Sequence, residues 1–125
     1  MTEEFKTSKP IYSQIADRII QQFVRGEIRP GEKLPSVREM AIQSGVNPNT
    51  IQRTYGELER MGVVESRRGQ GTFMTEQIEM RNQLRADIQR DIVAAFIENM
   101  RGIGLEDREI AHAVEQFLVK REEDK

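Results

Sequence analysis

Amide and guanidinium side chains gather in one short polar stretch of the chain and repeat at helical spacing. If Ile51 faces inward on a helix that turns 100° per residue, Asn49 and Arg53 face outward. Gln52 then lies on one flank and Thr50 on the other. Asparagine and glutamine can pair bidentately with adenine, and arginine with guanine. The stretch therefore predicts a helix whose outward face can contact bases in the major groove of DNA.

The start of this helix carries local signals of its own. Asn47 supplies a side-chain cap, and Pro48 occupies the first turn, where a missing N–H costs nothing. Free amides at a helix start favour a phosphate, so Asn47 and Thr50 are also candidates for contacts to the DNA backbone. For Asn47 the alternative is a purely structural cap. Gly62 is expected to end the helix.

A second group of candidate residues is basic and rich in glycine: Arg67, Arg68, Gly69 and Gly71. Arginines offer charge-assisted hydrogen bonds to phosphate, and glycines permit positive φ and close approach of another backbone. Short β-prone segments at 63–65 and 72–74 flank the group. The pattern predicts a hairpin with a basic tip.

A short helix is predicted immediately before the polar one. Ser36 and Glu39 form a capping box, in which the hydroxyl accepts from a free amide while the carboxylate reaches back, and Gly45 ends the helix. Two helices joined by so short a turn form a helix-turn-helix, and a hairpin directly after it makes a winged helix. Arg38 lies opposite the apolar edge of the short helix, so it is either a DNA contact or a solvated surface arginine.

Three runs, LPSVREMA, VNPNTIQRTYGELERMG and RRGQGTF, together resemble the DNA-binding domain of the GntR family of bacterial transcription regulators. The short C-terminal part resembles the YtrA-type subfamily. The resemblance implies a winged-helix domain over residues 8–75, with Arg38 and Arg68 in contact with DNA. The expected DNA-binding residues are Ser36, Arg38, Asn47, Asn49, Thr50, Gln52, Arg53, Arg67, Arg68, Gly69 and Gly71.

The core of this domain is expected where apolar residues share helical faces. A first helix, from Pro10 to about Gly26, has apolar residues at every fourth position. The resemblance also implies a short strand at Lys33-Leu34 beside the wing. The expected core consists of Ile15, Ile19, Phe23, Leu34, Val37, Met40, Ile51, Tyr55 and Leu58.

Past Met74 the pattern changes to two amphipathic helices, 76–101 and about 106–121, separated by a break at Gly102-Ile103-Gly104. Two such helices cannot bury both of their apolar stripes alone. We therefore expect residues 76–121 to form a dimerisation domain. Its expected interface residues are Leu84, Ile88, Ile92, Phe96, Ile110, Val114, Phe117 and Leu118.

Composition and charge bear on which other classes of protein this chain could belong to. The net charge of −2 argues against a nucleic-acid binder, but residues 1–75 carry 11 Lys/Arg against 9 Asp/Glu, while residues 76–125 carry 8 against 12. The chain has no cysteine and a single histidine, His112, so no metal site or nucleophile–base pair is expected. It shows no secretory signal and no membrane-spanning apolar run, which predicts a cytoplasmic protein.

These patterns predict a mainly α fold with an N-terminal winged helix-turn-helix, a small β-wing and a C-terminal two-helix dimerisation domain. The predicted function is regulation of transcription, most simply repression, by a homodimer bound to a palindromic operator in double-stranded DNA. No catalysis or cofactor is expected, and any small-molecule effector would bind between subunits. The alternative is a winged-helix module for protein–protein contacts, although outward Asn, Arg and Gln favour DNA. An aminotransferase-like fusion enzyme is not expected, because the tail after the wing is short and carries no catalytic constellation.

Overall fold

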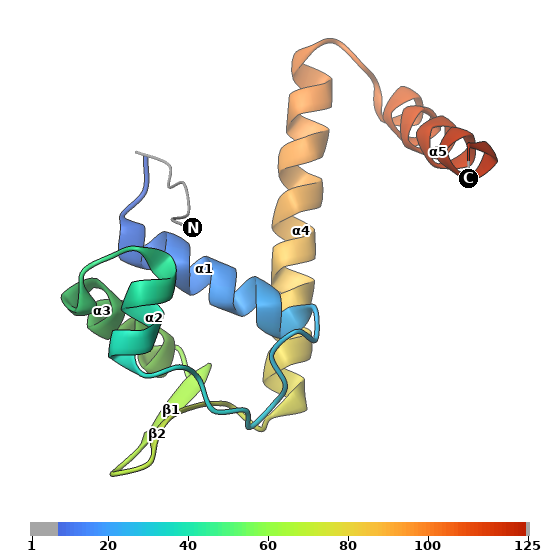
Figure 1. Ribbon diagram of the computed structural model, residues 1–125. Helices are drawn as coiled ribbons and strands as arrows, with labels where there is room; N and C mark the ends of the chain where they lie inside the picture. The colour runs from blue at the N-terminus through green and yellow to red at the C-terminus, as the bar shows by residue number, and fades with distance from the viewer. Residues whose placement is uncertain (1–7, 125) are drawn as a thin grey trace. The chain divides into compact units, whose positions relative to one another are not determined.

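The computed structural model describes residues 8–124, which are mainly helical and contain one small antiparallel sheet (Figure 1). The elements are α1 (Ile11–Val24), α2 (Val37–Ser44), α3 (Pro48–Arg60), β1 (Val64–Arg67), β2 (Gly71–Met74), α4 (Ile78–Gly102) and α5 (Asp107–Glu123). The chain divides into two compact units, which we call the N-terminal unit (Met1–Arg85) and the C-terminal unit (Ala86–Lys125). The division falls within α4.

The helices of the N-terminal unit start and stop where local signals predict. At α2 the capping box is present, since Glu39 N–H donates to Ser36 Oγ at 3.1 Å and Ser36 N–H donates to Glu39 Oε1 at 2.9 Å. Gly45 caps its C-terminal end. At α1 the carbonyl of Pro10 accepts the first free amides of the helix. These interactions satisfy amides that have no partner within the helix.

The core lies between α1, α3 and β1, with α2 packed on α3. The apolar side chains that it buries are Ile15, Ala16, Ile19, Ile20, Phe23, Leu34, Ala41, Ile51, Tyr55, Leu58, Val63, Val64 and Met74. The prediction placed Val37 and Met40 there too, but both are only half-buried. The reason is that the eight-residue α2 buries only Ala41 and Ser44. Val63, Val64 and Met74 were missed because the hairpin covers the end of the core.

The hairpin is longer than predicted. Its register pairs Val64 with Met74 and continues to Arg67 opposite Gly71, so Ser66, Arg67 and Gly71 belong to strands rather than to the loop. The predicted loop was therefore wrong by three residues, because the cross-strand ladder extends past the β-prone positions. The expected strand at Lys33-Leu34 is confirmed as a single bridge to Phe73, in which Leu34 N–H donates to Thr72 O at 2.8 Å.

The C-terminal unit consists of the rest of α4 and of α5, which ends at Glu123, two residues beyond the predicted end. Arg101 donates to Asp107 across the intervening turn, with its Nε 3.0 Å from Oδ1. Ile110 is the buried residue of α5, whereas α4 buries none completely. Most apolar side chains of this unit therefore remain available for another surface.

Candidate nucleic-acid interface

The polar helix of the helix-turn-helix is α3, and its inner side is anchored at two points. Thr54 Oγ1 donates to Tyr12 O at 3.1 Å, or to Thr50 O at 2.9 Å, which joins α3 to α1. Tyr55 Oη donates to Pro35 O at 2.6 Å, which joins α3 to the segment before α2. Burial raises the pKa of Tyr55, and the charge of Glu39 raises it further, so its hydroxyl stays a donor. These contacts set the rotation of α3 about its own axis.

The outer side of α3 carries the side chains that the sequence placed there. Asn49, Gln52 and Arg53 are exposed, and Thr50 is half-buried on the flank. Asn47 Oδ1 accepts from Asn49 N–H at 2.8 Å, so Asn47 is the helix cap. Its amide NH₂ is left over for a contact outside the helix.

Arg53 is held in place by an aromatic ring that the sequence pattern did not indicate. Its guanidinium carbon lies 4.1 Å from the ring centroid of Tyr12, a cation–π arrangement. Arg53, Asn49 and Thr50 line a shallow hollow of about 380 Å³ together with the first residues of α1. The starts of α1 and α3 therefore form one surface. An aromatic residue in the first turn of α1 was the only sequence signal for this role.

Tyr12→Leu is expected to weaken binding to site-containing DNA about two- to fivefold, because an exposed cation–π contact contributes roughly 0.5–1 kcal/mol. The loss reflects freer rotation of Arg53 before it meets DNA. Tyr12→Phe keeps the ring and should bind like the unmodified protein in a fluorescence anisotropy titration. If Phe and Leu at this position lose the same affinity, the hydroxyl and not the ring is responsible.

The start of α2 contributes Ser36 and Arg38. The hydroxyl oxygen of Ser36 accepts from the backbone N–H of Glu39 in the capping box. The hydrogen bonds from the Ser36 backbone and then from its hydroxyl hold the pKa of Glu39 below its ordinary value, so the box stays intact at neutral pH. Arg38 is exposed and has no hydrogen bond or ion pair with residues 8–124. Its charge is therefore available to a ligand.

The wing tip is a tight turn in which Gln70 N–H donates to Arg67 O at 2.9 Å. Gly69 has φ +75° and Gly71 has φ +117°, both in the left-handed half of the map that glycine tolerates. Arg68 is exposed at the turn and has no partner within the described part of the chain. Arg67 differs, because its guanidinium contacts Glu65 and Phe73 within the wing.

Gly71→Ala should destabilise the fold by about 1–3 kcal/mol, the usual range for a residue forced into a sparsely populated backbone region. A Cβ at this position would also lie 2.9 Å from Lys33 Cε. The matched control is Gly69→Ala, whose Cβ would meet nothing within 4 Å and whose φ is closer to the left-handed helical value. Urea unfolding of both variants compares them. Equal losses would show that the Lys33 side chain gives way without cost.

The expected dimer-interface residues of α4 and α5 differ in how far they are exposed in a single chain. Ile92, Phe96, Val114, Phe117 and Leu118 are exposed, and Leu84 and Ile88 are half-buried. Ile110 differs from the rest, since it is only 5% exposed within a single chain and offers a partner almost nothing. Hydrophobic spacing on α5 could not separate Ile110 from its exposed neighbours, because helical period alone does not tell which apolar residue of the stripe is covered.

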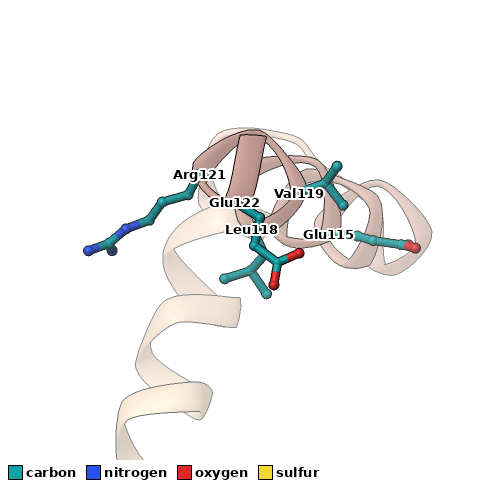
Figure 2. Close-up of a pocket in the computed structure, with 5 residues that line it drawn as sticks. All are labelled: Glu115, Leu118, Val119, Arg121 and Glu122. Carbon is teal, nitrogen blue, oxygen red and sulfur yellow. The ribbon is translucent and has the colours of Figure 1, made fainter. Parts of the chain in front are cut away.

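Two hollows accompany these side chains in the C-terminal unit. An apolar groove of about 390 Å³ is lined by Phe96, Met100, Ala113, Val114, Phe117 and Leu118. A shallower hollow of about 490 Å³ is lined by residues of α5 alone, including Leu118 and Val119 (Figure 2). The groove is the stronger candidate for contact with another apolar surface. It adds Met100 and Ala113 to the residues that the sequence singled out.

Other kinds of site find no support in residues 8–124. This part of the chain contains no group of three His, Cys, Asp or Glu residues that could hold a metal ion. None of its helices combines the length and the hydropathy needed to cross a membrane.

Sequence comparison gives the family directly. The model for bacterial regulatory proteins of the gntR family matches residues 11–74. The chain is 52% identical over 117 residues to the HTH-type transcriptional regulator YhcF of Bacillus subtilis, covering 94% of this chain and 97% of that protein. It is 46% identical over 71 residues to the transcriptional repressor YtrA of Bacillus subtilis, covering 57% of this chain and 55% of that protein. Both relatives are named as regulators and not as enzymes.

Solved structures agree with this result. A GntR family transcriptional regulator from Listeria monocytogenes is similar with a TM-score of 0.84 at 40% identity, covering 90% of this chain and 98% of that one. AraR(DBD) in complex with an operator is similar with a TM-score of 0.52 at 33% identity, covering 60% of this chain and 88% of that one. The predicted winged helix-turn-helix is confirmed. The chain belongs to the GntR family of bacterial regulatory proteins, in its YtrA-type branch.

Proposed function

We propose that this regulator binds a palindromic operator in double-stranded DNA as a homodimer and represses transcription. The observation that carries the proposal is the division of α3 into two sides. Its inner side is buried and hydrogen-bonded to α1 and to Pro35, while Asn49, Gln52 and Arg53 are exposed on its outer side. A helix held in this way can enter the major groove with amide and guanidinium groups in front.

Three parts of residues 8–75 would contact one half-site. Asn49, Gln52 and Arg53 are proposed to meet base edges, and Arg38 to meet a base edge or a phosphate. Ser36, Asn47 and Thr50 lie at or near helix starts, where a phosphate is favoured. At the wing, Arg68 supplies the charge, and Gly69 and Gly71 allow the backbone to come close.

Residues 76–121 are proposed to pair two chains. The apolar groove between Phe96 and Phe117 and the exposed Ile92 and Leu118 support this role, since water would otherwise cover them. A two-fold axis would present two α3 helices to half-sites separated by about one DNA turn, roughly 34 Å or a multiple. Any small-molecule effector would then bind between the paired subunits.

The relatives support the finer parts of the proposal. AraR(DBD) was solved bound to an operator, and YtrA of Bacillus subtilis is named a repressor. We carry both properties to this chain as proposals. The cytoplasm is the proposed location, because a bacterial operator lies there.

Selection of bound sequences from a random double-stranded DNA pool by the full chain tests the proposal. The expected result is an enriched inverted repeat whose half-sites are spaced by about one helical turn. The triple variant Asn49→Ala, Gln52→Ala, Arg53→Ala is the control and should enrich no sequence, because it removes the outer side chains of α3 and leaves the buried side intact. If the unmodified protein enriches no sequence, the proposed sequence-specific binding is refuted, and a module for protein–protein contacts becomes the better interpretation.

A further inference from the structure

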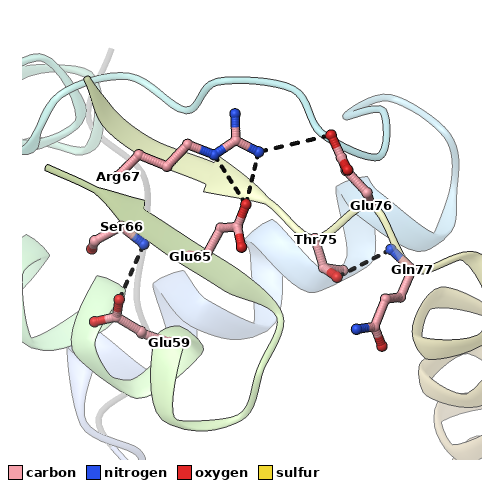
Figure 3. A network of polar contacts seen from close by, with 7 residues as sticks. All are labelled: Glu59, Glu65, Ser66, Arg67, Thr75, Glu76 and Gln77. Atoms are coloured by element: carbon pink, nitrogen blue, oxygen red, sulfur yellow. Dashed lines mark hydrogen bonds and ion pairs between the residues drawn. The ribbon is translucent and has the colours of Figure 1, made fainter.

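Two neighbouring arginines at the wing differ in what they contact. Arg68 extends from the turn and has no partner among residues 8–124, whereas the side chain of Arg67 is 35% exposed and makes contacts on three sides. Figure 3 shows the guanidinium of Arg67 between Glu65 of the same strand and Glu76, which follows the wing. Residue type alone does not distinguish the two arginines, but the family resemblance implies a DNA contact for Arg68, and the structure shows different contacts for the two side chains.

The contacts of Arg67 come from both strands and from the segment after them. Its Nε and Nη2 donate to Glu65 Oε1 at 3.0 and 2.7 Å. Its guanidinium carbon lies 4.1 Å from the centre of the Phe73 ring, and Phe73 is the cross-strand partner of Glu65. Residues 65, 67 and 73 therefore share one face of the hairpin. Nη2 also lies 3.8 Å from Glu76 Oε1.

The electrostatics of this face disfavour a phosphate at Arg67. Two carboxylates flank one guanidinium, so the local charge sums to −1, and a phosphate there would meet two like charges. Arg68 has no acidic neighbour of this kind in an ion pair with it among the described residues. Of the two arginines, Arg68 is the one suited to DNA.

Arg67 also lies where it can orient the tip. Its carbonyl accepts from Gln70 N–H and closes the turn that carries Arg68. Its partner Glu76 belongs to the short segment between β2 and α4, where Thr75 Oγ1 accepts from Gln77 N–H at 3.1 Å. Arg67 thus contacts the turn through its backbone carbonyl, and contacts the face of the hairpin and the segment that leads into α4 through its side chain.

We infer that Arg67 is a positioning residue of the wing: its guanidinium, stacked on Phe73 and paired with Glu65 and Glu76, orients the tip so that Arg68 meets the DNA. The inference rests on the proposed DNA binding. A Lys at this position keeps the charge but loses the planar fork and the stack, so Lys cannot replace Arg here.

The test compares Arg67→Lys, Arg67→Gln and Phe73→Leu, with Arg68→Gln as the control. All three test variants should bind the selected operator about three- to tenfold more weakly, as expected for loss of one stacked and paired contact, with an unchanged slope of log affinity against log salt. Arg68→Gln should flatten that slope by about 1 for each wing. Thermal melting checks that every variant is folded.

Hydrogen exchange of the Gln70 amide, followed by NMR on the protein without DNA, supplies a second readout. Arg67→Lys and Phe73→Leu should speed this exchange, and Arg68→Gln should leave it unchanged. Wild-type affinity of Arg67→Lys together with a flattened salt slope of Arg67→Gln would make Arg67 a phosphate contact and overturn the inference. Unchanged exchange in both Arg67→Lys and Phe73→Leu would overturn it as well. Failure of the unmodified protein to bind DNA would refute the proposed function alone, since the exchange measurement needs no DNA.

Discussion

Phe117→Asp is expected to yield a monomer that binds the full operator about 10²- to 10⁴-fold more weakly, the range over which linkage of two weak sites raises affinity. Phe117 is 69% exposed in a single chain, so aspartate there does little to the isolated fold. In the dimer, the same substitution would bury a charge in the apolar groove that Phe117 lines. Phe96→Asp should act in the same way, because Phe96 also lines the groove.

Gln116→Asp is the matched control, because it adds the same charge to an exposed position on another side of α5. Sedimentation velocity should show a dimer for this variant and for the unmodified protein. Titration with a full operator and with an isolated half-site then separates pairing from base contact, since Phe117→Asp should leave half-site affinity unchanged. A dimeric Phe117→Asp protein with normal operator affinity would mean that the groove has another role.

Arg38→Ala should cost about 1–3 kcal/mol of binding free energy for each half-site if Arg38 contacts a base edge, and a symmetric dimer carries that loss twice. Arg38 has no internal partner among residues 8–124, so its removal leaves no unpaired group in the free protein. The loss should therefore appear in DNA binding and not in thermal stability. The Arg38→Ala variant should also lose its preference for a particular base at one base pair of each half-site.

Arg121→Ala removes the same charge from an exposed position on α5 and controls for a change in net charge. Affinity for the operator and for a scrambled duplex, measured at several salt concentrations, compares the two variants. If Arg38→Ala lowers the affinity for both duplexes equally, Arg38 contacts a phosphate and does not contribute to base preference. If Arg38→Ala loses no more binding affinity than Arg121→Ala, Arg38 does not contact DNA and is a solvated surface arginine.

Local sequence was sufficient to predict the helices and to assign the buried and exposed faces of α3. The capping box at Ser36, the Asn47-Pro48 start and the break after α4 depend on interactions within four residues, which a linear pattern contains. The exposed Asn49 and Arg53 follow from helical period once Ile51 is buried. The family resemblance, carried by contiguous runs of residues, was also accessible from sequence and is confirmed.

The contacts and the burial of individual side chains could be found only from the tertiary structure. Arg67 and Arg68 are adjacent and carry the same side chain, yet the hairpin places Glu65 of the same strand and Phe73 of the paired strand beside Arg67 and leaves Arg68 exposed. Arg53 is held by Tyr12, 41 positions earlier in the chain. Hydrophobic spacing likewise grouped Ile110 with exposed residues, although the fold buries it.

Sequence by itself therefore determined the elements, the family and the set of polar residues from which an interface could be built, because these depend on short-range interactions and helical period. The tertiary structure decided which residues are exposed without an internal contact, which are held by another side chain and which are buried. These outcomes depend on how the folded chain brings side chains together, as Arg53 on Tyr12 and Arg67 on Phe73 show, and the distances and directions of such contacts are absent from a linear pattern.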